Sequence, residues 1–139
     1  MKVRLDAETI ESINFFQNLT GAYVMDMLSE DDTLYFVVGK GQYGYAVGKN
    51  GEKIKKAENL FKKKIRILEY FDTVLEFITA AIPEAKNIEV KDGVVKINVP
   101  PSERPKVIGK SGSKIRALTK ITERLYETKG IKLLTPVRM

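Results

Sequence analysis

The sequence predicts an α+β fold in which one order of helices and strands occurs twice. Apolar residues follow helical spacing in some segments and strand spacing in others. In addition, residues 46–68 resemble residues 107–134, and both segments begin with the pattern apolar-Gly-Lys-x-Gly-x-Lys-Ile. Gly48 and Gly51 of the first copy recur as Gly109 and Gly112. An internal repeat of this length indicates two similar structural units.

In the first half of the chain we predict a helix over 6–19, because the apolar residues of this segment are spaced to share one helical face. Asp6 is a suitable N-cap, and Gly21 lies just beyond the end. Residues 22–28 and 33–38 predict the two strands of a hairpin. A helix follows the glycine turn, and a third strand begins at residue 64. The apolar positions expected in these helices are Ile10, Ile13, Phe16, Leu19, Ile54, Ala57 and Phe61.

The second half predicts the same order. A helical spacing begins at Phe71 and stops at Pro83. Residues 87–90 and 94–99 flank a tight turn that contains Asp92-Gly93. Each half is therefore expected to form a three-stranded sheet backed by helices, with domains at 1–70 and 71–139. The apolar positions expected in the helices are Phe71, Val74, Leu75, Ile78, Ile82, Ile115, Leu118, Thr122 and Leu125.

Positive charge occurs in two blocks separated by acidic sequence. The formal net charge is +6. Residues 39–70 contain nine basic and three acidic side chains, and residues 102–124 contain seven and two. Residues 1–38 contain only two basic side chains against seven acidic ones. A protein that binds phosphates needs locally concentrated cations, so two basic blocks suggest two sites.

The composition argues against most catalysis. The chain has no cysteine and no histidine, which removes thiolate ligands, the commonest general base and the commonest zinc ligand. No pair of carboxylates stands out as a catalytic pair. We therefore expect no enzyme activity, no catalytic residue, no metal and no cofactor. No apolar run is long enough to span a bilayer and no secretory signal is apparent, so we expect a cytoplasmic protein with no membrane partner.

The two glycine turns are the candidate site. A Gly-x-x-Gly turn before a helix exposes backbone amides at the positive end of the helix dipole, where they bind anions. Glycine lets a sugar-phosphate chain lie against the backbone. A plain connector between helices is the alternative, but a connector has no need to repeat its lysine. The candidate residues are Val47, Gly48, Lys49, Asn50, Gly51, Lys53, Ile108, Gly109, Lys110, Ser111, Gly112 and Lys114.

Two other glycine motifs fail on their context. Residues 39–44 fit the dinucleotide pattern G-x-G-x-x-G, but Gly48 and Gly51 interrupt the helix that this pattern requires. A bend between a strand and a helix is the simpler interpretation of these residues. The second turn resembles the end of a P-loop, but the earlier glycine of that motif would fall on Arg104. Neither nucleotide motif is therefore supported.

The segments VGKNGEKI and IGKSGSKI resemble the signature of KH domains, whose G-x-x-G loop joins two helices. The order helix, strand, strand, helix, helix, strand resembles the type II, prokaryotic KH arrangement. Residues 44–47 and 103–108 correspond to the helix before each loop. Two such domains in tandem, covering nearly the whole chain, are similar to the KH pair of NusA-like transcription factors.

The resemblance implies a single-stranded RNA-binding protein of transcription elongation or termination. It implies that each loop clamps the RNA backbone while a neighbouring groove accommodates bases. RNA polymerase is an implied partner, but the chain has no sequence for the additional domains of bacterial NusA. Ribosome assembly or RNA processing, a protein-interaction module and a nucleotide-binding enzyme remain alternatives. We expect a monomer, because each half already has an internal partner.

Overall fold

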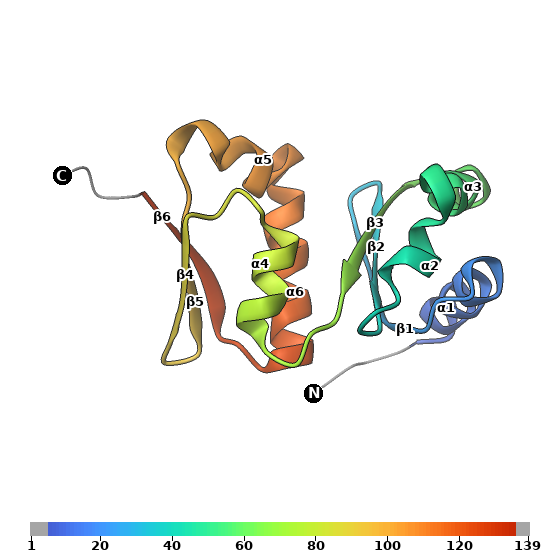
Figure 1. The fold of residues 1–139 in the computed structure, drawn as a ribbon, viewed down its shortest axis with the longest axis horizontal. Coiled ribbons are helices and arrows are strands. Elements are labelled where there is room, and N and C mark those ends of the chain that lie inside the picture. Colours follow the sequence, from blue (N-terminus) through green and yellow to red (C-terminus); the bar gives the residue numbers. More distant parts are fainter. Residues whose placement is uncertain (1–5, 136–139) are drawn as a thin grey trace. The chain divides into compact units, whose positions relative to one another are not determined.

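The computed structural model describes residues 6–135 and divides into two compact units (Figure 1). The division falls between Phe71 and Asp72, one residue after the expected boundary. Each unit has the order helix, strand, strand, short helix, helix, strand. The predicted α+β class with three-stranded sheets is confirmed.

The first unit is a mixed sheet with its helices on one face, as Figure 1 shows. β2 is the central strand, antiparallel to β1 and parallel to β3. A parallel pair needs a long crossover connection, and here that crossover contains two helices separated by the first glycine turn. The elements are α1 (Ala7–Thr20), β1 (Val24–Glu30), β2 (Thr33–Val38), α2 (Tyr43–Val47), α3 (Glu52–Phe61) and β3 (Lys64–Glu69).

Helix α1 begins and ends where its capping residues predict. The Asp6 side chain accepts a hydrogen bond from the Thr9 backbone amide at 2.8 Å, and Gly21 ends the helix with a φ of 79°. Phe16 is fully buried and stacks on Phe36 of β2, with ring centroids 4.0 Å apart. Ile10 is the exception, because it continues the apolar stripe past the last core residue and is exposed.

The second unit repeats this topology. β5 is central, antiparallel to β4 and parallel to β6. The hairpin turn contains Asp92 and Gly93 with φ of 52° and 80°, as the Asp-Gly pair predicts. The elements are α4 (Val74–Ala81), β4 (Asn87–Lys91), β5 (Val94–Asn98), α5 (Arg104–Ile108), α6 (Ser113–Tyr126) and β6 (Gly130–Leu134).

Helix α4 begins later than the apolar spacing predicts. The Thr73 hydroxyl accepts a hydrogen bond from the Glu76 amide at 3.2 Å, and this N-cap leaves Phe71 outside the helix. Phe77 and Ile78 form the buried face. A turn of about 100° per residue places Leu75 to the side of that face, where it is exposed. The expectation that Phe71 and Leu75 belong to one buried helical stripe was wrong.

The helices after the glycine turns pack as predicted. Ala57 is buried in the first unit, and Ile54 and Phe61 are partly buried against the same core. In α6, Leu118, Thr122 and Leu125 are buried, and Ile115 is half-buried. The core thus holds α3 and α6 against their sheets and fixes where each glycine turn enters its helix.

Candidate functional site

Each glycine turn lies between a short helix and a long one. The first loop, Gly48–Gly51, joins α2 to α3, and the second loop, Gly109–Gly112, joins α5 to α6. Ala46 and Val107, on the short helices, are fully buried. These apolar anchors fix the entry to each loop, and the long helix fixes its exit.

The two loops have the same backbone conformation. Gly48 and Gly109 have φ/ψ of 76°/171° and 78°/175°, a region that essentially only glycine adopts. Asn50 and Ser111 follow at 55°/27° and 54°/26°, in the left-handed region. A hydrogen bond from the amide of the last glycine to the carbonyl of the first closes each turn at 3.1 Å. The repeated sequence therefore specifies a repeated loop geometry.

A close contact explains why the first glycine of each loop carries no side chain. A Cβ on Gly48 would lie 2.7 Å from Cγ of Lys53 and 3.0 Å from its backbone nitrogen. A Cβ on Gly109 would lie 2.7 Å from Cβ of Lys114 and 3.0 Å from its backbone nitrogen. The lysine of the first helical turn therefore packs directly across the loop. Lys53 and Lys114 therefore each pack against a loop in addition to carrying a charge.

The loop side chains are open to solvent. Lys49 and Asn50 are exposed in the first loop, and Lys110 and Ser111 are exposed in the second. Val47 and Ile108, which precede the loops, are half-buried. The first amides of α3 and α6, those of Glu52 and Ser113, donate to the carbonyls of Lys49 and Lys110 inside the preceding turns. Each loop nevertheless lies at the positive end of a helix dipole. Each loop thus brings together an exposed cation, the positive end of a helix dipole and an apolar residue.

The ammonium group of Lys53 is already engaged within the structure. Its Nζ donates a 2.7 Å hydrogen bond to the carbonyl of Thr20, at the end of α1. Positive groups stabilise the carbonyl end of a helix. The structure thus places Lys53 beside the first loop but directs its charge toward α1. Lys114, its counterpart, also has a polar or electrostatic interaction within the structure.

Arg116 is a loop contact that the sequence argument did not place in the site. Its Nη1 donates a hydrogen bond to the carbonyl of Ser111, in the second loop. The same Nη1 lies 3.0 Å from the position that a Cβ on Gly112 would occupy. The corresponding residue of α3 is Lys55, which is exposed. An arginine four residues after the last glycine of a loop was the sequence signal for this contact.

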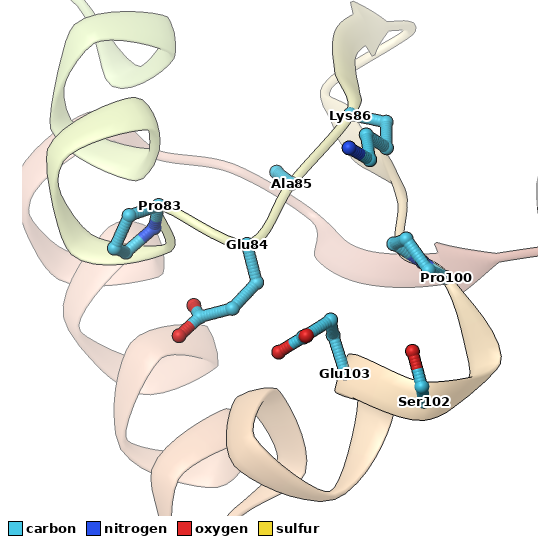
Figure 2. Close-up of a pocket in the computed structure, with 7 residues that line it drawn as sticks. All are labelled: Pro83, Glu84, Ala85, Lys86, Pro100, Ser102 and Glu103. Carbon is cyan, nitrogen blue, oxygen red and sulfur yellow. The ribbon is translucent and has the colours of Figure 1, made fainter.

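The second unit also contains a cavity of about 570 Å³, and no residue of the second loop lines it. Figure 2 shows the carboxylates of Glu84 and Glu103 pointing into it. Negative groups repel phosphate, so the cavity has the wrong charge for a nucleic-acid backbone. Glu103 is paired with Lys106 at 3.2 Å. The lining residues are Pro83, Glu84, Ala85, Lys86, Pro100, Ser102 and Glu103.

Residues 6–135 contain neither of two other features. Within residues 6–135, no group of three or more His, Cys, Asp or Glu side chains is arranged to hold a metal ion. In the same range no helix is long and apolar enough to cross a membrane.

Comparison with known proteins identifies the family. The KH domain matches residues 12–78, which include the first loop. The chain is 37% identical to the "Probable transcription termination protein NusA" of Methanococcus vannielii, over 99% of this chain and 83% of that protein. It is 34% identical to the protein of the same name from Methanocaldococcus jannaschii, over 96% and 76%. The chain therefore belongs to the family of NusA-like KH-domain proteins.

A solved structure shows the same fold over nearly the whole chain. The crystal structure of APE1850 superposes with a TM-score of 0.76 and covers 94% of this chain and 100% of its own. Because the sequence identity is only 22%, this comparison shows that the two proteins share a fold and shows nothing about function. The KH domain match ends at residue 78, so most of the second unit lies outside it.

Proposed function

We propose that this protein binds single-stranded RNA with two type II KH domains, one in each unit, and acts in transcription termination or elongation. KH domains bind RNA by clamping about four nucleotides at the G-x-x-G loop. The observation that carries the proposal is the match between the loops, which have the same dihedral angles and the same exposed lysine. This match supports our proposal that the second unit, like the first, is a KH domain.

The proposed contacts divide into three kinds. The side chains of Lys49 and Lys110 bind phosphates, and the positive ends of the α3 and α6 dipoles favour the same negative charge. Gly48, Gly51, Gly109 and Gly112 keep the backbone accessible, and Asn50 and Ser111 occupy the exposed apex. Val47 and Ile108 contribute an apolar floor on which bases rest. Lys53 and Lys114 support the loops by packing across Gly48 and Gly109, and their charge adds to the local positive potential.

The transcriptional role is supported by the relatives' names. Both methanogen proteins are called probable transcription termination proteins. We infer that this chain acts as a cytoplasmic monomer on nascent RNA and contacts RNA polymerase. Recovery of RNA polymerase subunits together with the tagged protein from its own cells tests the proposed contact with RNA polymerase. Recovery of ribosomal precursor RNA without polymerase would instead support a role in ribosome assembly or RNA processing.

Equilibrium binding to a labelled single-stranded RNA library, at several salt concentrations, tests the proposal. The variants are Lys49→Asp with Asn50→Asp, and Lys110→Asp with Ser111→Asp. Aspartate tolerates the left-handed conformation of Asn50 and Ser111, so both variants are expected to fold. The matched control is Lys86→Asp with Asn87→Asp, which changes exposed residues outside both loops.

We expect each loop variant to bind at least tenfold more weakly, and the control to bind like the wild type. Each loop variant reverses one cation and adds a further negative charge where a phosphate is expected. Wild-type affinity should also fall steeply with salt, because bound phosphates release counterions. Circular dichroism checks that each variant is folded. No RNA binding by the wild type, or unchanged binding by both loop variants, would contradict the proposal.

A further inference from the structure

The short helices before the two loops have different surfaces. Tyr43 and Tyr45 of α2 are exposed, with 48% and 58% of their surface accessible. At the corresponding positions α5 has Arg104 and Lys106. Both helices have a buried apolar residue followed by a half-buried one at the last two positions, whereas Gly44 of α2 is replaced by Pro105 in α5. The exposed tyrosines are therefore the difference in side-chain chemistry at the entrance to the loops.

Tyr43 lies on the same side of α2 as the residue that leads into the first loop. It precedes Val47 by four positions, and side chains at that spacing are neighbours on a helix surface. Tyr45 is about 200° around the helix from Tyr43 and so lies on the other flank. Gln42 fixes the start of α2, because its side chain accepts a hydrogen bond from the Tyr23 amide at 3.2 Å.

We propose that Tyr43 stacks on an unpaired base of the bound RNA, so that the first unit holds a base as well as the phosphates. This inference rests on the RNA-binding function proposed above. Nearly half of the Tyr43 surface is exposed, beside an apolar residue and a loop that carries the exposed Lys49. Aromatic rings next to positive charge are the combination with which proteins bind single strands, and every base has a face on which they can stack.

The second unit has no aromatic ring at this position. Arg104 donates a 3.1 Å hydrogen bond from Nη2 to the hydroxyl of Thr135, which follows β6. The guanidinium is thus directed toward the end of the sheet. Of the two short helices, only α2 therefore offers an aromatic ring on which a base can stack. The second loop acts mainly through contacts with the RNA backbone. The two units are expected to contribute unequally, with the first more sensitive to the presence of bases.

Binding measurements with three variants test this inference. They are Tyr43→Ala, Tyr43→Phe and the matched control Tyr45→Ala, which removes a somewhat more exposed ring from the other flank of α2. Each is titrated with a single-stranded RNA and with the same strand carrying abasic nucleotides, across a salt series. Thermal unfolding checks that the folded state is intact.

We expect Tyr43→Ala to bind the intact RNA about tenfold more weakly, within the range known for loss of one base–aromatic stack. The salt dependence should be unchanged, because no phosphate contact is lost. Tyr43→Phe and Tyr45→Ala should bind like the wild type, and the abasic strand should not distinguish Tyr43→Ala from wild type. A general structural defect would weaken binding of both strands.

Either of two results would overturn the inference while leaving the proposed function intact. One is a wild type that binds RNA in a salt-dependent manner while Tyr43→Ala binds as tightly. The other is an equal loss for Tyr43→Ala on the intact and abasic strands. Failure of the wild type to bind any RNA would instead contradict the proposed function itself.

Discussion

The first and second loops have the same backbone but different supports. Their φ/ψ values agree within a few degrees at each position described above. Around the first loop, Lys53 reaches back to the end of α1. Around the second, Arg116 bonds to the loop itself. The α3 helix has 10 residues, whereas α6 has 14.

This difference separates what the repeated motif requires from what each unit adds. The glycine with positive φ, the residue in the left-handed conformation and the lysine packed across the loop occur in both units. The bond from Lys53 to Thr20 supports the first loop, and the bond from Arg116 to Ser111 supports the second. We infer that the backbone conformation is the shared requirement, and that the neighbouring side chains adjust each loop separately.

The largest expected effect comes from adding a methyl group at the first glycine of a loop. Gly109→Ala brings a Cβ to 2.7 Å from Cβ of Lys114, and its φ of 78° is strained for alanine. We expect the free energy of unfolding to fall by roughly 3 kcal/mol, as measured by urea denaturation. The first loop should respond similarly to Gly48→Ala.

The last glycine of the first loop is the matched control. A Cβ on Gly51 would meet only Cγ2 of Ile54, at 3.7 Å, and the residue has an ordinary left-handed conformation. Gly51→Ala should therefore lose only about 1 kcal/mol. An equal loss for Gly48→Ala and Gly51→Ala would show that the close contact with Lys53 is unimportant.

Substitutions of Lys49, in the first loop, and of Lys53, in the first turn of α3, should affect RNA binding and stability separately. Lys53→Met removes the hydrogen bond to Thr20 while keeping a long apolar side chain, so we expect a loss of about 1 kcal/mol in the free energy of unfolding. Lys49→Met should leave stability unchanged and lower the salt dependence of RNA binding by about one counterion. Unfolding and salt titrations measure the two effects. The opposite pattern would contradict the roles assigned to these lysines.

Support of the second loop by Arg116 should be visible as a smaller effect. Arg116→Ala removes the hydrogen bond to Ser111, and we expect RNA affinity to fall about threefold to fivefold. Lys55→Ala changes the corresponding residue of the first unit and serves as the control. Fluorescence anisotropy with a single-stranded RNA compares the two. Equal losses for both variants would indicate that only the charge of Arg116 matters.

The smallest expected effect is at the end of α3. Lys62 ends this helix with a φ of 56°, a conformation that glycine adopts without strain. Lys62→Gly should stabilise the protein by about 0.5 kcal/mol, because relief of strain is partly offset by the greater freedom of glycine in the unfolded chain. A small rise in the midpoint of thermal unfolding is the expected result, and a fall would contradict it.

Much of the fold was predictable because the relevant signals are local. Asp6 and Gly21 marked the ends of α1, and Asp92-Gly93 marked a hairpin. The start of α4 was not predictable from apolar spacing, because the Thr73 cap decided it. Spacing also could not show that Phe77 would take the buried position and leave Leu75 exposed.

Glycine spacing identified the two candidate loops, but it did not identify the side chains that hydrogen-bond beside them. The bond from Lys53 to Thr20 joins residues 33 positions apart, and no local pattern signals it. Arg116 was not among the candidate residues, although it contacts Ser111 in the loop. The Lys53 contact depends on how α1 and α3 pack, which sequence spacing does not specify. The Arg116 contact is local, and the position of this arginine four residues after Gly112 could have indicated it.

Titration of the isotope-labelled protein with a short single-stranded RNA, followed by NMR, tests the central claim most directly. Amide resonances of both loops, Gly48–Gly51 and Gly109–Gly112, report on each proposed clamp separately. We predict that the amides of both loops shift together with those at the starts of α3 and α6. Shifts confined to one loop, or to surfaces distant from both, would contradict the account in which both loops hold the RNA backbone.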